Sequence, residues 1–177
     1  MLKKGTYPGS VIVFLVIGVG LLTVPLDLVV MHCFVDPVNG DSGFFCSFVY
    51  ASVNTVDRRC LWKSLNIFKG IVKDMPWTIL GDFNVCLDPS KRSCGSSKFT
   101  TAMADFRDCV EEIEVDDIAM TGLRFTWNKK PGREGGLLKK LDRVLGNSSF
   151  VSSFPSSFAH FLPYMLSDHS PAVIAIP

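Results

Sequence analysis

Short apolar runs separated by turn-forming residues make up most of this chain, and their length and β-branched or aromatic content predict strands. The turn-rich residues 36–41 favour a hairpin between the first two runs. The predicted strands are Leu28–Val35, Phe44–Tyr50, Trp77–Leu80, Ile118–Ala119, Phe125–Trp127, Leu138–Leu145, Phe158–Leu162 and Ala172–Ile176. The Ser-rich stretch Ser148–Ser157 is interpreted as a loop.

Two longer stretches carry apolar residues at helical spacing. Arg58–Val72 has an apolar stripe that Pro76 stops, and Phe99–Ile113 has a second stripe that Thr100 or Thr101 can cap. Strands with two interspersed helices predict an α/β fold. We expect a two-sheet β-sandwich, with the sheets packed face to face and flanked by helices.

The first 27 residues differ from the rest of the chain. Lys3 and Lys4 precede the apolar run Val11–Leu22, which has the length and flank of a secretory signal core, although no small-x-small cleavage site follows it. Pro25 and Asp27 end the run before it reaches the ~20 residues that cross a bilayer. Three interpretations stay open: a buried strand that packs against the sheets, a signal or membrane anchor, and an error in the gene structure.

Composition adds few constraints. A chain of 177 residues with 47% hydrophobic and 20% charged residues is typical of one globular domain and excludes disorder. The 18 basic and 17 acidic residues give a net charge of +1, so the overall charge neither implies nor excludes nucleic acid. Basic clusters occur in the predicted loops at Lys91–Arg92 and at Lys129–Lys130 with Arg133. The six cysteines contain no Cys-x-x-Cys pair, which favours free thiols in a reducing compartment.

Candidate chemistry lies at the ends of predicted strands. Gly81 can break the strand before it and deliver Asp82 and Asn84 into a loop, although both are also ordinary turn formers. Asp142 is an acidic residue inside an apolar strand, where it is costly unless it is paired. The sequence Ser167-Asp168-His169 precedes the last strand. These strand ends therefore offer carboxylates, an amide and a histidine for phosphodiester hydrolysis.

Four motifs in this order resemble the endonuclease/exonuclease/phosphatase superfamily, which has the DNase I-like fold. They are Gly81-Asp82-Phe83-Asn84, Phe125-Thr126-Trp127, Leu141-Asp142-Arg143 and Ser167-Asp168-His169-Ser170-Pro171. The variant with Leu-Asp-Arg-Val-Leu is similar to the endonuclease domains of plant non-LTR (LINE-type) retrotransposons. The resemblance runs from residue 28 to residue 177, and residues 1–27 are an atypical hydrophobic segment.

The resemblance implies a role for each residue of the catalytic group. His169 is expected to be the general base, within hydrogen-bond reach of Asp142, which fixes its tautomer. Asp82 is expected to position the attacking water, and Asn84 to donate a hydrogen bond to a phosphate oxygen.

Three further residues complete the expected site. Asp168 is expected to be the metal ligand, and Tyr50, at the end of a strand, to contact the scissile phosphate, although it also suits a half-buried aromatic. Thr126 is a weaker candidate from the same kind of match. His32 and His160, inside apolar strands, are interpreted as structural.

The resemblance is incomplete at the N-terminus. Nothing before Tyr50 matches the Asn and the metal-binding Glu that the family carries on its first strands, and the first Glu of the chain is Glu111. Mg²⁺ is therefore expected to bind weakly through an incomplete ligand set. We expect a phosphodiesterase-type domain, ancestrally a DNA endonuclease of a retroelement, that is weak or inactive.

Alternatives remain open for activity, partner and location. The chain is also compatible with a non-catalytic remnant or binding module, or with a phosphoinositide or small phosphate ester phosphatase that has an N-terminal anchor. DNA is the expected partner, a membrane could be bound through residues 11–22, and the sequence gives no basis for a protein partner. The retroelement resemblance implies an intracellular, nuclear protein, and the anchor alternative implies a membrane or secretory one.

Overall fold

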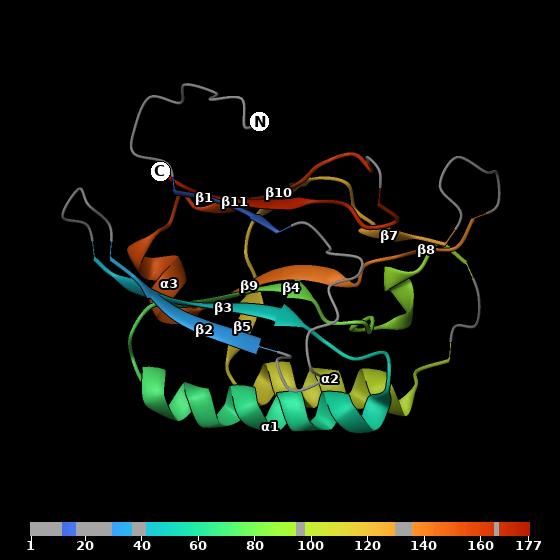
Figure 1. Cartoon of the computed structure of the whole chain (residues 1–177), viewed down its shortest axis with the longest axis horizontal. Helices are drawn as coiled ribbons and strands as arrows, with labels where there is room; N and C mark the ends of the chain where they lie inside the picture. The colour runs from blue at the N-terminus through green and yellow to red at the C-terminus, as the bar shows by residue number, and fades with distance from the viewer. Residues whose placement is uncertain (1–11, 17–29, 37–41, 95–97, 130–135, 165–166) are drawn as a thin grey trace.

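The computed structural model describes residues 12–16, 30–36, 42–94, 98–129, 136–164 and 167–177, which form two stacked sheets with two long helices on one side (Figure 1). The helices are α1 (Thr55–Val72), α2 (Thr101–Glu112) and α3 (Ser148–Ser153), with a 3-10 turn at Pro89–Lys91. The strands are β1 (Ile12–Val16), β2 (Val30–Val35), β3 (Phe44–Tyr50), β4 (Trp77–Asp82), β5 (Val115–Asp117), β6 (Met120–Gly122), β7 (Trp127–Asn128), β8 (Leu138–Lys139), β9 (Asp142–Asn147), β10 (Phe158–Phe161) and β11 (Ala172–Ile176).

The strands form one sheet of five, one of four and one of two. The large sheet has the order β2-β3-β4-β9-β5, and the small sheet has the order β1-β11-β10-β6. The strands β7 and β8 make a separate two-stranded hairpin beside both sheets (Figure 1). Helices α1 and α2 lie side by side on the outer face of the large sheet, so the molecule has three layers.

Two apolar cores hold these layers together. The core between the large sheet and its helices includes Leu61, Trp62, Leu65, Trp77, Ile79, Phe83, Met103, Phe106 and Leu145. The core between the two sheets includes Phe44, Cys46, Leu80, Val144, Phe150, Phe161, Ala172 and Ile174. Alternate residues of β4 and β9 therefore enter opposite cores, as a strand buried on both faces requires.

Several predicted elements are confirmed. The hairpin partners β2 and β3 pair antiparallel, although the turn residues 37–41 lie outside the described residues. Thr100 caps α2, since its side chain accepts a hydrogen bond from the backbone N–H of Met103. All six cysteines are free.

Of the apolar N-terminal run, the described residues Ile12–Val16 form β1, which pairs antiparallel with β11. The rest of that run lies outside the described residues. Among the helices of the described part of the chain, none is both long enough and apolar enough to span a membrane.

Other predictions were wrong. The predicted strand Leu138–Leu145 is two strands, because the chain leaves the β7–β8 hairpin at Lys140 and enters the large sheet at Asp142. The expected Ser-rich loop contains α3, whose first turn is capped by Asn147 and whose Phe150 is fully buried. A cap and one anchoring aromatic outweigh the weak helix propensity of serine here.

Gly81 allows β3 and β4 to approach at the end where the site lies. It lies opposite Val49 in the parallel pairing of these strands. Gly81 has φ +143°, and a Cβ at this position would lie 1.9 Å from the carbonyl oxygen of Val49. Any side chain would force the strands apart, so glycine is required here to keep the next residue, Asp82, in register with Tyr50.

A buried pair of cations shares one carboxylate at the edge of the large sheet. Arg143 Nη1 lies 2.5 Å and Lys140 Nζ 3.1 Å from Oδ2 of Asp117, and the two basic side chains are 0% and 6% exposed. Arg143 Nε and Nη2 are buried and have no hydrogen-bond partner among the described residues. The charge of Asp117 is therefore the main compensation for two desolvated cations.

We predict that Asp117→Asn lowers the free energy of unfolding by about 3 kcal/mol, because it leaves Arg143 and Lys140 buried without a counter-charge. Asp116→Asn is the matched control, since the Asp116 side chain is exposed, and it should change stability by less than about 0.5 kcal/mol. Urea unfolding measures both. Equal stabilities for the two variants would contradict this account of the charge cluster.

Candidate active site

The candidate site lies where strands of both sheets end. Asp82 is the last residue of β4, Asp142 is the first residue of β9, and the two lie opposite each other in an antiparallel pair. Tyr50, the last residue of β3, is the neighbour of Asp82 on the other side. His169 comes from the other sheet, three residues before β11 begins. Residues far apart in sequence therefore meet at one rim of the sandwich.

His169 contacts both aspartates. Its Nδ1 lies 3.0 Å from Oδ2 and 3.2 Å from Oδ1 of Asp142, so the hydrogen bond expected between them is present. Its Nε2 lies 3.9 Å from Oδ2 of Asp82. When Nδ1–H donates to Asp142, Nε2 is left as the basic nitrogen, and it faces Asp82. This tautomer makes His169 a geometrically suitable general base.

Asn84 is held against Asp82 by a tight turn. It has φ 52°, a left-handed conformation that asparagine tolerates better than most residues. Its backbone N–H donates to Oδ1 of Asp82 at 2.8 Å, and its side-chain amide donates to Oδ2 of Asp82 at 3.2 Å and to the carbonyl of Ala51 at 3.0 Å. The turn that Gly81 begins therefore brings carboxylate and amide together.

The hydroxyl of Thr126 fixes the start of β9. Thr126 is 0% exposed, and its Oγ1 accepts hydrogen bonds from the backbone N–H groups of Leu141 at 3.0 Å and Asp142 at 2.8 Å. Its carbonyl accepts from the N–H of Ser170, next to His169. Thr126 thus connects the segments that carry Asp142 and His169, a role that its sequence context only weakly indicated.

Asp168 and Tyr50 lie at the edge of this group. Oδ2 of Asp168 accepts a hydrogen bond from the indole Nε1 of Trp127 at 2.8 Å. Trp127 is partly buried and packs against the core between the large sheet and its helices. Tyr50 is 61% exposed at the end of β3. The role of Asp168 as a metal ligand and that of Tyr50 in phosphate contact stay predictions.

Burial and mutual charge change the proton affinity of the site. Burial, followed by the charge of Asp142, raises the pKa of Asp82 to about 6. Burial acts to lower the pKa of His169, but the hydrogen bond and charge of Asp142, with the charges of Asp82 and Asp168, outweigh it and raise that pKa. Both shifts follow from negative charge concentrated in a desolvated cluster.

This cluster fits a divalent cation. Asp82, Asp142 and His169 each offer a ligand atom, and these atoms lie within 4.8 Å of one another. The two carboxylates are oxygen donors of the kind that Mg²⁺ prefers. Burial first, and then the charge of Asp142, raises the pKa of Asp82, and a bound cation would offset both effects. Asp168 is not among the three clustered ligand atoms.

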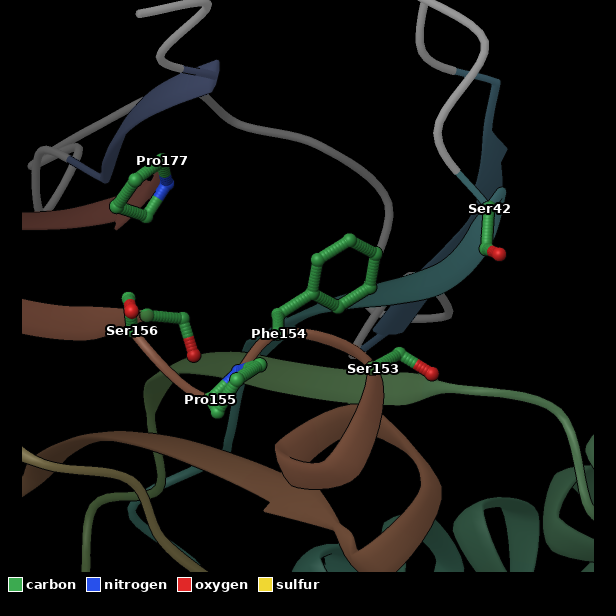
Figure 2. Close-up of a pocket in the computed structure, with 7 residues that line it drawn as sticks. Ser42, Ser153, Phe154, Pro155, Ser156 and Pro177 are labelled. Carbon is green, nitrogen blue, oxygen red and sulfur yellow. The ribbon is translucent and has the colours of Figure 1, made fainter.

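The hollow in Figure 2 lies at the other end of the strands. Its lining residues are Ser42, Ser153, Phe154, Pro155, Ser156, Ser157 and Pro177. Ser42 precedes β3 and Pro177 follows β11, whereas Tyr50 ends β3 and His169 precedes β11. The described residues that line this hollow include no ionisable side chain, whereas the rim carries two aspartates and a histidine.

His32 and His160 lie away from the rim. His32 stacks on Phe68 with ring centroids 3.5 Å apart, and its Nδ1 lies 2.7 Å from the hydroxyl of Ser47. His160 lies in β10 with its Nδ1 2.8 Å from the hydroxyl of Thr121. These contacts agree with the structural roles expected for both.

Three solved structures show what the fold is similar to. Beta toxin from Staphylococcus aureus matches with a TM-score of 0.56 at 15% sequence identity, over 82% of this chain and 56% of the toxin chain. A variant of that toxin with bound magnesium ions matches with a TM-score of 0.56 at 14% identity, over 84% and 57%. A functionally unknown conserved protein from Enterococcus faecalis matches with a TM-score of 0.54 at 15% identity, over 82% and 54%.

These likenesses concern the fold. The expected two-sheet DNase I-like sandwich flanked by helices is confirmed, and the chain spans little more than half the length of the three structures. No family model and no curated protein matches the chain.

We predict that stability falls as pH rises through the titration of Asp82. Its pKa is about 6 in the folded state and 3.8 in the reference state, so the folded chain binds the proton more tightly. This contribution to the free energy of unfolding is present below pH 3.8 and is lost as pH rises through about 6. The pKa of His169 is also raised, so its contribution to stability likewise falls as pH rises. In urea unfolding with a chelator, the wild type should lose about 2 kcal/mol relative to Asp82→Asn between about pH 4 and about pH 7. A difference in unfolding free energy between the two proteins that stays constant over this pH range would contradict the raised pKa of Asp82.

We also predict that Thr126→Val lowers the free energy of unfolding by about 2 kcal/mol, because two buried backbone N–H groups lose their acceptor. Thr126→Ser keeps the hydroxyl and should lose only about 1 kcal/mol for the deleted methyl group. Urea unfolding of the two variants separates the effects. A valine variant as stable as the serine variant would show that the hydroxyl does not hold the start of β9.

Proposed function

We propose that this chain is a metal-dependent phosphodiesterase-type hydrolase that cleaves DNA, derived from a retroelement endonuclease. The observation that carries the proposal is the contact of His169 with Asp142 through Nδ1, which leaves Nε2 facing Asp82. A histidine oriented by one carboxylate and facing another is an arrangement that can activate water. The DNase I-like fold supports the same class of chemistry only by analogy.

The side chains would divide the reaction between them. His169 takes a proton from water, and the imidazolium that forms is stabilised by Asp142, which accepts its Nδ1–H. Asp82 orients the water from the side of Nε2. The amide of Asn84 would keep its contact with the carbonyl of Ala51 and exchange its longer contact with Asp82 for a phosphate oxygen. Negative charge develops on that oxygen as the new P–O bond forms and the bond to the leaving oxygen breaks.

Mg²⁺ is the metal that the oxygen donors favour. Asp82 and Asp142 would hold it, with Asp168 as the further ligand that the sequence resemblance implies. When bound, the ion would stabilise charge on the phosphate and on the leaving oxygen. The described residues offer no glutamate at this rim, so we expect weak binding and slow turnover.

Cations beside the rim support a nucleic acid substrate. Nζ of Lys139 lies 5.0 Å from the centroid of the Trp127 ring, whose indole N–H contacts Asp168. Lys129 lies just after Trp127 on the same hairpin and is exposed. Two cations on one hairpin beside the carboxylates can contact successive phosphates of a DNA backbone. Inositol phosphates offer similar charge, and the experiment includes them.

We predict that the chain nicks supercoiled plasmid DNA slowly in Mg²⁺, that EDTA abolishes nicking, and that excess Mg²⁺ raises the rate only in part. His169→Ala should lower the rate at least about 100-fold, because a general base contributes about 100-fold or more. His160→Ala is the matched control, since His160 lies in β10 and contacts Thr121, and it should leave the rate unchanged.

Four results would contradict the proposal. Nicking that persists in EDTA would exclude the metal dependence. Equal rates in the two histidine variants would exclude the assigned base. Hydrolysis of inositol phosphates without plasmid nicking would assign a small phosphate ester as the substrate, and binding of DNA without hydrolysis would assign a binding remnant.

A further inference from the structure

Arg58 is a buried cation close to the candidate site that the proposed catalytic group does not include. It lies in the first turn of α1 and is 5% exposed. No ion pair found among the described residues includes it, whereas its neighbour Arg59 pairs with Asp105 at 2.8 Å. Burial lowers the pKa of Arg58, and the charges of Asp105 and Asp82 oppose this shift. Burying a guanidinium without a paired carboxylate costs folding free energy. We therefore expect the hydrogen bonds of Arg58 to serve a specific structural role.

The guanidinium of Arg58 turns back onto the loop that precedes α1. Its Nη1 donates to the carbonyls of Ser52 and Val53, both at 2.8 Å, and its Nη2 donates to the hydroxyl of Thr55 at 3.1 Å. We call residues 51–54 the rim loop. The planar guanidinium therefore fixes two successive carbonyls of the rim loop in one geometry.

The rim loop in turn contacts the site at its first residue. The N–H of Ala51 donates to the carbonyl of Asp82 at 2.7 Å, and the carbonyl of Ala51 accepts from the amide of Asn84 at 3.0 Å. The same amide contacts Oδ2 of Asp82 at 3.2 Å. A chain of hydrogen bonds thus runs from Arg58 through the rim loop to Asn84.

We propose that Arg58 is a positioning residue for the candidate site: it clamps the rim loop so that the carbonyl of Ala51 holds one N–H of the Asn84 amide. The other N–H, which contacts Asp82 in the structure, is then directed so that it can be transferred to the substrate phosphate. This rests on the function proposed above, in which Asn84 contacts the phosphate during hydrolysis. An amide that is free to rotate donates less often in the required direction, and small misplacements near a reacting group lower rates strongly. Arg58 itself touches neither substrate nor reacting atoms.

The kinetic test uses Arg58→Met and Arg59→Met, which remove adjacent guanidinium groups of which only one contacts the rim loop. We expect Arg58→Met to lower kcat about tenfold with KM unchanged, and Arg59→Met to change neither. In the Asn84→Ala background, Arg58→Met should lower kcat by less than about twofold, because both changes remove one interaction. A tenfold loss in that background, a change in KM alone or an equal loss for Arg59→Met would overturn the proposal.

A second measurement does not depend on hydrolysis. The side-chain amide of Asn84 gives a pair of signals in a ¹H–¹⁵N spectrum, which Asn84→Ala identifies by their loss. In Arg58→Met these signals should shift and exchange faster with solvent, while Arg59→Met leaves them unchanged. Unchanged signals in Arg58→Met would overturn the positioning role. Wild-type protein that fails to hydrolyse phosphodiesters would refute the proposed function, and the amide signals would still decide the role of Arg58.

Arg58→Lys keeps the test decisive if the methionine variant does not fold. A lysine ammonium cannot reproduce the planar contact with two carbonyls and a hydroxyl, so an intermediate kcat and intermediate amide signals are expected. Full activity with unchanged Asn84 signals in Arg58→Lys would show that the positive charge suffices and that the clamp is not required.

Discussion

The hydroxyl of Thr126 is the contact on which the geometry of the rim depends. The two sheets are separate hydrogen-bonded units, so their packing alone does not fix how a loop of one sheet meets a strand end of the other. Thr126 accepts from the N–H of Asp142 and, through its carbonyl, from the N–H of Ser170. One buried residue of the β7–β8 hairpin region therefore joins the start of β9 to the approach to β11. The distance between Asp142 and His169 follows from these bonds.

Much of the site could be predicted from the sequence. An Asp in an apolar strand, at position 142, is costly unless it is paired. The Gly-Asp-x-Asn turn at position 81 is ordinary turn chemistry by itself, and it indicated a site only as one of four motifs in order. Strand ends of a two-sheet sandwich meet at a common rim, so the geometry of Asp82, Asn84, Asp142 and His169 could be anticipated. The helices followed from the spacing of apolar residues, and the hairpin followed from the turn-forming residues 36–41.

The missed features depend on side-chain directions that a linear pattern does not contain. Arg58 begins a helical stripe and would ordinarily be assigned to solvent, and only the structure shows its guanidinium turning back to the rim loop. Asp117 lies in an acidic stretch where its pairing with Arg143 has no distinct signal. The break at Lys140 depends on a change of sheet, which is a tertiary event. Helix α3 depends on the burial of Phe150, the aromatic residue within a serine-rich segment.

The opposite charges of neighbouring residues in β9 also favour the observed register of this strand over one shifted by a residue. Asp142 enters the rim, whereas Arg143 lies on the opposite face of the strand, with its guanidinium 5.9 Å from the Phe106 ring of α2. A slip of one residue exchanges the two faces of a strand. It would place an arginine between the sheets beside His169 and an aspartate against an aromatic ring under a helix. A strand displaced by one residue would therefore bury each charge without its partner, and this electrostatic cost favours the observed pairing of β9 over the shifted one.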